Sequence, residues 1–218
     1  GIVDPNGQVT SYNLRWHQYP LRERFPGEVF LANDMDAAAL GEVRFGAAKG
    51  FKDVLLVTFS SGIGAGIIKD GQIHLGASGT AGEVGHMTID IQDNALLCRC
   101  GRRGCWERYA SGTAHSLRVL EAVRSGTWAW CDFSGLDEQE IVERITQMAR
   151  EGDQAALELI KRTRWFMAAG LINLVNIINP EIIIITGGLA RATWDLIGKR
   201  LREMINSRSV LPKLIRTI

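Results

Sequence analysis

The chain has 218 residues, of which 46% are hydrophobic and 22% are charged, with 25 Lys and Arg residues against 24 Asp and Glu residues. This composition is typical of a globular protein and excludes a disordered one. The charges are scattered, so we expect no direct nucleic-acid binding by this segment. No apolar run approaches the ~20 residues needed to span a bilayer and residues 1–25 contain no signal peptide, so we expect a cytoplasmic protein with no membrane partner.

The first half of the chain predicts a short strand, a helix and three further strands. Residues 29–32 form the strand and residues 35–49 the helix, so that Asn33-Asp34 lies at their junction. Residues 53–60 form a buried strand, and residues 61–76 form two more strands joined by a turn at Lys69-Asp70-Gly71. The three strands are expected to form an antiparallel meander.

The second half is predicted to be mostly helical after an irregular region rich in Gly and Cys at residues 77–105. Helical periodicity covers residues 106–123, 136–150 and 154–178, a β-branched strand follows at 181–186, and a last helix covers 190–207. This order of elements predicts an α/β fold in which a mixed sheet is flanked by helices.

Three cysteines and one histidine have the spacing of a metal site. Cys98, Cys100 and Cys105 form a C-x-C-x4-C pattern, and His86 lies 12 residues before Cys98. Three thiolates and one imidazole complete the tetrahedral ligand set of zinc and leave no position open for water, which is typical of a structural ion. The alternative is a group of buried thiols without metal. Cys131 has no such partners and is expected to pack in the core.

Several strings in series resemble the ROK family of bacterial sugar kinases and sugar-responsive repressors. They are LANDMDAAALGE, SSGIGAGI, GEVGHMTID, LCRCGRRGCWERYASGTA and ITGGLA, and the likeness extends over nearly the whole chain. The resemblance implies an actin-like ATPase (ribonuclease H-like) domain with a zinc-stabilised loop. It also implies a hexose substrate, with ATP and magnesium as the phosphoryl donor.

The same resemblance implies roles for individual residues. Asp34 would be the general base for a sugar hydroxyl, and Asn33 would bind a neighbouring hydroxyl. Glu83, His86 and Glu107 would be the remaining sugar contacts, so His86 would serve both the metal and the sugar. Without the resemblance, Asn-Asp before a helix is an N-cap and each Glu is a solvated surface charge.

Two glycine-rich turns are candidates for nucleotide binding. Ser61, Gly62 and Gly64 could turn backbone N–H groups toward phosphate oxygens, although a plain hairpin has the same pattern. The family usually has Gly-Thr where this chain has Ser60-Ser61. Gly187 and Gly188 follow a strand and would allow a nucleotide to come close, although an ordinary strand-to-helix turn would also explain them.

The resemblance also leads us to expect further sequence on both sides of this segment. ROK kinases begin with an Asp-Gly-Gly-Thr type phosphate loop that is absent here, and they usually continue beyond KLIRTI with another helix. We therefore interpret residues 1–32 as a remnant of a small N-terminal domain and residues 33–218 as the large C-terminal domain. On this interpretation the 218-residue chain by itself is expected to turn over ATP poorly.

Two functions fit these patterns. The first is an ATP-dependent hexose kinase, favoured by the Asn33-Asp34 pair and both glycine turns. The second is the sugar-sensing effector domain of a transcriptional repressor. Family members commonly form dimers or tetramers, and the aromatic residues Trp128, Trp130 and Phe133 are candidates either for such a contact or for the core. The residues do not distinguish one hexose from another.

Overall fold

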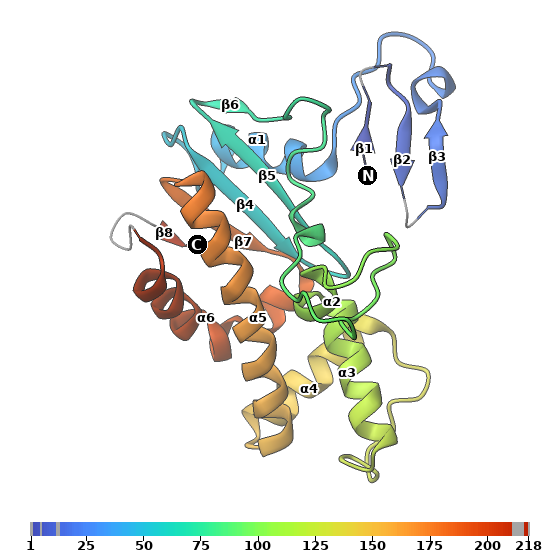
Figure 1. The fold of residues 1–218 in the computed structure, drawn as a ribbon, viewed down its shortest axis with the longest axis vertical. Helices are drawn as coiled ribbons and strands as arrows, with labels where there is room; N and C mark the ends of the chain where they lie inside the picture. Colours follow the sequence, from blue (N-terminus) through green and yellow to red (C-terminus); the bar gives the residue numbers. More distant parts are fainter. Residues whose placement is uncertain (1, 5, 12–13, 211–215, 218) are drawn as a thin grey trace.

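The computed structural model describes residues 2–4, 6–11, 14–210 and 216–217, and within them the strands form two sheets. The small antiparallel sheet consists of β1 (Ile2–Val3), β2 (Val9–Ser11) and β3 (Trp16–Tyr19). The five-stranded sheet has the order β6 (Gln72–Ile73), β5 (Ile63–Lys69), β4 (Val54–Phe59), β7 (Ile182–Thr186) and β8 (Arg216–Thr217). Figure 1 shows the small sheet standing to one side of the large one. Whether the two are separate domains, divided at residue 32, stays a prediction.

The helices follow the chain order given in Figure 1. They are η1 (Leu21–Arg24), α1 (Asp34–Phe45), η2 (Val84–His86), α2 (Glu107–Ala110), α3 (Gly112–Arg124), α4 (Glu138–Arg150), α5 (Gln154–Ile178) and α6 (Gly188–Arg208). In the described part of the chain, no helix is long and apolar enough to cross a membrane.

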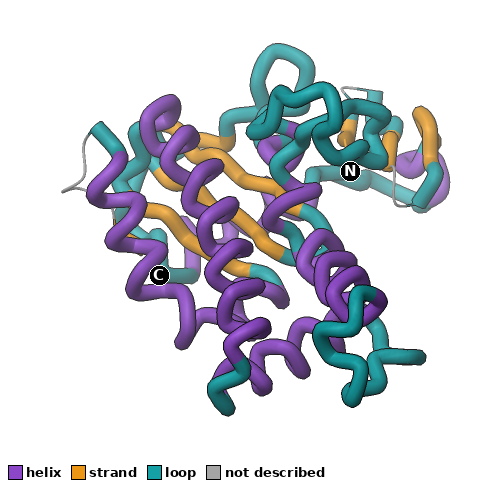
Figure 2. The backbone as a smooth tube through the Cα atoms, turned by 60° about the horizontal axis from the view of Figure 1, so that its bottom comes forward, coloured by secondary structure: helices purple, strands orange, loops and turns teal. Residues whose placement is uncertain are grey.

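The large sheet is mixed and has a helical layer on each face, as predicted. β4 pairs antiparallel with β5 and parallel with β7, and β5 pairs antiparallel with β6, which confirms the meander. Alternate residues of β4 point to opposite faces. Leu55 and Val57 pack in the core beneath α5 and α6, whereas Val54 and Leu56 pack against Ala39 of α1. Figure 2 shows α5 and α6 lying across the strands.

Two of the predicted elements are wrong in detail. Residues 29–32 form no strand, because no neighbouring strand pairs with them, and the Phe30 side chain is 85% exposed. The helix predicted over residues 106–123 is divided into α2 and α3 at Ser111, whose backbone is extended and whose Oγ accepts a hydrogen bond from the Ala114 N–H. Ser111 therefore ends one helix and caps the next.

The aromatic residues between α3 and α4 divide between core and surface. Trp128 and Phe133 are buried, and the Trp128 indole N–H lies 3.3 Å from the Asp153 carboxylate oxygens. Trp130 is 72% exposed. The core interpretation therefore holds for two of the three residues. Cys131 is also buried, as expected.

Candidate functional site

One cavity of about 690 Å³, open to solvent, collects the residues predicted to bind sugar and most of those predicted to bind phosphate. It is lined by the predicted residues Asn33, Asp34, Ser61, Gly62, Gly64, Glu83, His86 and Glu107. Residues Ile2, Thr10 and Ser11 of the small sheet contribute to its lining. Gly187 and Gly188 are not part of this cavity. The segments that line it are far apart in the sequence, so the fold itself assembles the site.

Asn33 and Asp34 reach the cavity from the N-terminus of α1. The Asn33 side chain caps the helix by accepting a hydrogen bond of 2.8 Å from the Met35 N–H, and Asp34 Oδ1 lies 3.1 Å from the same donor. Asp34 lies in the first turn of α1, at the positive end of the helix dipole. The N-cap interpretation is therefore correct for Asn33, and it leaves the Asp34 carboxylate lining the cavity.

Asp36, which the sequence analysis did not single out, lies behind this carboxylate. It is buried, and burial, followed by the negative charges of Asp34 and Glu83, raises its pKa. A second, buried carboxyl group therefore lies near Asp34 on α1, although it does not line the cavity. Asp36 follows Asp34 by two positions in the first turn of a helix, where acidic residues are common for helix-dipole reasons alone, so its pattern carried no separate signal.

The turn between β4 and β5 lies beside two carboxylates. The Glu107 Oε2 atom is 3.2 Å from the point that a Cβ on Gly62 would occupy. The Thr113 hydroxyl is 2.8 Å from the Ser61 carbonyl oxygen and 2.5 Å from Glu138 Oε2. Thr113 and Glu138 also line the cavity. A phosphate at this turn would therefore meet negative charge unless a cation came with it.

His86, Cys98, Cys100 and Cys105 come together, with one ligand atom from each lying within 4.8 Å of the others. Cys98 Sγ is 3.8 Å from His86 Nδ1, and Cys100 Sγ is 3.6 Å from Cys105 Sγ. Bonds of about 2.3 Å to a tetrahedral zinc ion would place neighbouring ligands about 3.8 Å apart. The donor set and its spacing therefore fit zinc.

The protonation of these thiols supports the same conclusion about the donor set. Burial raises the pKa of the Cys98 and Cys105 thiols. A buried thiolate is therefore disfavoured unless a cation accompanies it. The pKa of the Cys100 thiol is lowered instead, because the effect of burial is outweighed by hydrogen bonds with the Arg102 backbone and the neighbouring thiols. Two thiols of raised pKa beside Cys100 and an imidazole form a donor set suited to a cation.

The metal cluster and the cavity share side chains. His86 Nδ1 faces Cys98, whereas His86 Nε2 lies 3.8 Å from Glu83 Oε2, a residue of the cavity lining. The Cys98 thiol lies 3.2 Å from Glu107 Oε1. His86 therefore lies between the three cysteines and the cavity, and its double role stays a prediction.

Backbone contacts position both sides of the cluster. On the His86 side, Gly85 packs so closely on the Ile63 carbonyl of β5 that a Cβ would clash with it. On the cysteine side, the Ile89 N–H donates to the Gly104 carbonyl oxygen at 2.9 Å, and the Trp106 N–H donates to Met87 at 2.8 Å. These bonds bring Cys105 beside Thr88 and so toward His86.

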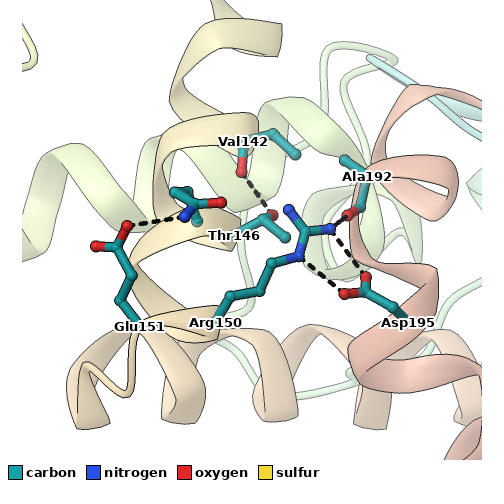
Figure 3. Close-up of polar contacts among 7 residues, drawn as sticks. Val142, Thr146, Arg150, Glu151, Ala192 and Asp195 are labelled. Atoms are coloured by element: carbon teal, nitrogen blue, oxygen red, sulfur yellow. Dashed lines mark hydrogen bonds and ion pairs between the residues drawn. The ribbon is translucent and has the colours of Figure 1, made fainter.

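Gly188 lines a second cavity, of about 400 Å³, between α4 and α6. Arg150 and Arg191 also line it. Arg150 is fixed there by a two-pronged contact with Asp195, at 2.8 and 2.9 Å, and by a bond to the Ala192 carbonyl (Figure 3). Gly187, with φ +100°, lies so close to the Phe59 carbonyl that no side chain fits. The sequence analysis predicted the glycines but not this cavity.

The comparisons with known proteins agree with this geometry. The sequence model of the ROK family matches residues 1–213. The chain is 39% identical over 218 residues to the xylose repressor of Caldicellulosiruptor bescii, covering 97% of this chain and 54% of that protein. It is 34% identical to the glucokinase of Thermotoga maritima, covering 94% of this chain and 66% of that protein. The chain therefore spans about half to two thirds of the length of these curated relatives.

A solved structure supports the fold. The ROK family glucokinase from Streptomyces griseus, determined in complex with glucose and AMPPNP, superposes with a TM-score of 0.83 at 30% identity, covering 100% of this chain and 73% of that one. The predicted actin-like ATPase fold is thereby confirmed. Both sugar kinases and sugar-responsive repressors are among the proteins that this chain is similar to.

Proposed function

The chain belongs to the ROK family, and from this premise we propose that it is the sugar-binding part of an ATP-dependent hexose kinase. The observation that carries the proposal is that Asp34, the turn at residues 61–62 and the group Glu83, His86 and Glu107 all open onto one cavity. Phosphorylation of a hydroxyl requires a carboxylate at the nucleophile and a phosphate held in line with it. The cavity offers a candidate for each requirement.

In this mechanism the sugar lies against α1 and against the metal-binding loop, defined as residues 86–105, which carry the proposed metal ligands. The Asp34 carboxylate accepts the proton of one sugar hydroxyl as the oxygen of that hydroxyl attacks the γ-phosphorus of ATP. The bond from the γ-phosphorus to the bridging oxygen breaks, and ADP leaves. Asn33 orients a neighbouring hydroxyl, and the carboxylates of Glu83 and Glu107 accept hydrogen bonds from others. ATP, accompanied by magnesium, supplies the phosphoryl group. Several acceptors around one hydroxyl-rich ring would fix which hydroxyl faces Asp34.

We propose that a structural zinc ion is held by His86, Cys98, Cys100 and Cys105. The ion would supply no chemistry beyond a fixed position for its ligands, because four protein ligands leave no open site. With Nδ1 committed to the metal side, the Nε2 atom of His86 remains for Glu83 and the sugar. The metal would thereby fix the tautomer and direction of a substrate contact.

The nucleotide is proposed to lie along the start of α6. The close approach of Gly187 to β4, together with the position of Gly188 on the second cavity, supports this placement. Backbone N–H groups of the turn at residues 61–62 would face the phosphates. The phosphates would then reach Asp34 from the β4–β5 side, while the sugar approaches from the metal-binding loop.

The cellular setting follows from the chemistry. Phosphorylation of a sugar with ATP is a cytoplasmic reaction, so we propose a cytoplasmic protein. We also propose a homo-oligomer, and the 72% exposed Trp130 supports a contact on the loop that precedes α4. Light scattering at micromolar concentration tests the second point, because a monomer there would contradict it.

The test of the kinase is Asp34→Asn in the full-length protein, assayed for ADP release with a panel of hexoses. Sugar binding should persist while kcat falls by roughly 10²–10⁴-fold, because the amide keeps one acceptor oxygen but accepts no proton. Asp70→Asn is the matched control, because Asp70 lies in the β5–β6 turn, away from the cavity, with φ 52°, which Asn tolerates. Unchanged turnover by the Asp34 variant would remove its catalytic role.

A second function is favoured by a specific observation, the Glu138 carboxylate beside the turn at residues 61–62. In the effector domain of a sugar-responsive repressor, the cavity would bind a sugar and no nucleotide. Calorimetric titration with a hexose and then with magnesium-ATP separates the two functions. Sugar binding without nucleotide binding in the full-length protein would favour the repressor.

Glu138→Gln sharpens this comparison, because it keeps the hydrogen bond to Thr113 while removing the charge. If Glu138 excludes nucleotide, the variant should gain ATP affinity by roughly tenfold, the factor expected from one nearby charge. Glu121→Gln on α3 is the control, since Glu121 is exposed and lines neither cavity. An ATP affinity that stays the same in the Glu138 variant would show that this carboxylate does not exclude nucleotide.

A further inference from the structure

The three cysteines of the proposed zinc site differ in their access to solvent. Cys105 is completely buried and Cys98 is 3% exposed, whereas Cys100 is partly exposed and lines the cavity of about 690 Å³. Neither Cys98 nor Cys105 lines that cavity. A small molecule that enters the cavity can therefore reach the sulfur of Cys100 but not the other two sulfurs.

A second thiol lies close behind the exposed one. Cys100 Sγ is 3.6 Å from Cys105 Sγ. A disulfide bond is about 2.0 Å long, so the two sulfurs would have to approach each other by roughly 1.6 Å to form one. A displacement of that size is within the range of a side-chain rotation combined with a small shift of a turn.

The backbone around this pair allows the movement from one side. Cys105 is fixed in place, because the next residue, Trp106, is buried and donates its N–H to the Met87 carbonyl oxygen at 2.8 Å. Cys100 lies in a turn in which the residues on either side of it are exposed. Gly101, which follows it, has no atom within 4 Å of the point that a Cβ would occupy. The turn can therefore bring Cys100 toward Cys105 without disturbing the core.

We propose that Cys100 is an oxidation site, at which a peroxide that enters the cavity attacks, and that Cys105 then closes a reversible disulfide with it. The exposed thiol reacts with the oxidant, and the buried thiol behind it resolves the product. Sulfurs that hold a zinc ion are thiolates, which is the form that reacts with a peroxide. The proposal thus builds on the proposed zinc ion, but it does not require kinase activity.

The oxidation takes place in two steps. The Cys100 sulfur attacks one oxygen of hydrogen peroxide, so that an S–O bond forms, the O–O bond breaks and hydroxide leaves. The Cys105 sulfur then attacks the Cys100 sulfur, so that the S–S bond forms, the S–O bond breaks and a second hydroxide leaves. Two electrons pass in total from the two thiolates to the peroxide. The zinc ion loses two of its proposed ligands and is released.

Oxidation of this pair would act on the sugar cavity. Without the ion, His86 would lose its fixed direction beside Glu83, so hexose affinity should fall. Conversely, a hexose in the cavity would cover Cys100 and slow its oxidation, because both would occupy the same space. These two consequences rest on the proposed sugar-binding function, whereas the formation of the disulfide does not.

The experiment treats the zinc-loaded protein with hydrogen peroxide and follows the released zinc with a chromogenic chelator. Peptide mass spectrometry without reduction then identifies the disulfide. We expect loss of the bound zinc, a bond between Cys100 and Cys105, and recovery of both thiols and zinc binding after dithiothreitol and zinc are added. Zinc that is retained under peroxide, or a disulfide that joins Cys98 to another cysteine, would overturn the proposal.

Cys100→His is the main variant, because an imidazole can ligate zinc but cannot form a disulfide. The remaining thiol ligands are buried, so zinc release under peroxide should be slower by about tenfold or more. Cys131→Ser is the matched control and should release zinc at the wild-type rate, since Cys131 lies away from the cluster near Arg144. Equal release rates in Cys100→His and the wild type would contradict the proposal. If Cys100→His takes up no zinc, the disulfide mapped in the wild type decides.

A second arm repeats the peroxide treatment in the presence of saturating glucose and of other hexoses. Slower formation of the disulfide with one of them would support both the oxidation site and the sugar cavity. The same disulfide formed at the same rate with every hexose would support the oxidation site and count against a sugar in this cavity. The failure of the proposed function is therefore distinguished from the failure of the oxidation site.

Discussion

The two walls of the sugar cavity are held in place by different forces. The wall formed by α1 and the β4–β5 hairpin rests on the core, where Ala39, Val54 and Leu56 are almost completely buried. The opposite wall, residues 77–105, has little regular structure, and its Ile91 and Leu97 side chains are 91% and 55% exposed. Apolar burial thus accounts for the first wall, whereas the second would depend on the zinc that we propose for His86, Cys98, Cys100 and Cys105.

Trp106 joins the two kinds of structure. It follows Cys105, a proposed metal ligand, it is completely buried, and its indole N–H donates to the Phe166 carbonyl oxygen at 2.7 Å. Its ring meets the Phe59 ring edge-on, with centroids 5.4 Å apart. The C-terminal end of the metal-binding loop is therefore anchored to the core. The comparison between the walls can be tested by changing either the loop before Trp106 or the core residues that pack against its ring.

The largest expected effect comes from breaking the ligand cluster. Elemental analysis of the wild type should find one zinc per chain. Cys105→Ser should remove that zinc and should lower hexose affinity by roughly tenfold to a hundredfold. The reason is that His86 and Glu107 lose their fixed positions. Far-UV circular dichroism should change little, since the helices and the large sheet lie outside the loop.

Cys131→Ser is the control for this variant. Cys131 is buried like Cys105, but it lies near Arg144, away from the cluster. It should retain both zinc and sugar affinity. A metal-free wild type that is fully folded would remove the zinc proposal, and unchanged sugar affinity in a zinc-depleted Cys105 variant would contradict the coupling of metal and sugar sites.

The same contrast explains how much of the site the sequence could predict. The four proposed metal ligands lie within twenty residues of one another and carry the signal of their residue types, so local pattern was sufficient to single out the group that the structure brings together. Thr113 and Glu138 lie 25 positions apart, and only the packing of α3 against α4 brings them to the turn at residues 61–62. Such a pair has no local pattern.

The fold shows a parallel difference. The apolar strands and the periodic helices were predictable because burial on one or both faces dictates their sequence. The apolar residues 29–32 also resembled a strand, but a strand requires a neighbour, and none is present among the described residues. The division at Ser111 followed from a local signal, a serine before glycine, that the continuous helical periodicity around it concealed.

A smaller effect is expected from the core side of Trp106. Gly170 of α5 lies against the Trp106 ring so closely that a Cβ would clash with it. Gly170→Ala should lower the free energy of unfolding by about 1–3 kcal/mol, the usual cost of overpacking. Gly41→Ala, in α1 with open space around it, should instead raise the stability by up to about 1 kcal/mol.

Chemical denaturation of both glycine variants measures these changes in the free energy of unfolding. Titration with a hexose then shows whether a change in the core alters the sugar affinity. Because Trp106 carries the end of the metal-binding loop, Gly170→Ala should also weaken sugar binding, whereas Gly41→Ala should not. Opposite stability changes without any change in sugar affinity would mean that the loop does not depend on Trp106 for its position.

The last effect is absent at neutral pH and develops only in acid, and it concerns the buried His115. Its folded-state pKa is lowered from 6.5 to about 3, by burial and then by the charge of Arg118, so the folded protein keeps it neutral while the unfolded chain protonates below pH 6.5. Its contribution to stability is therefore fully present above pH 6.5 and is lost as the pH falls toward 3, at about 1.4 kcal/mol per pH unit.

His115→Asn isolates this contribution from that of the carboxylates, which also titrate in acid. The amide can still donate to Thr163 but takes up no proton, so the variant should be less stable at pH 7 and yet lose less stability between pH 6.5 and 5 than the wild type does. Urea denaturation at several pH values gives both slopes. Parallel slopes would show that His115 is not the group responsible, and that acid weakens the protein through other side chains.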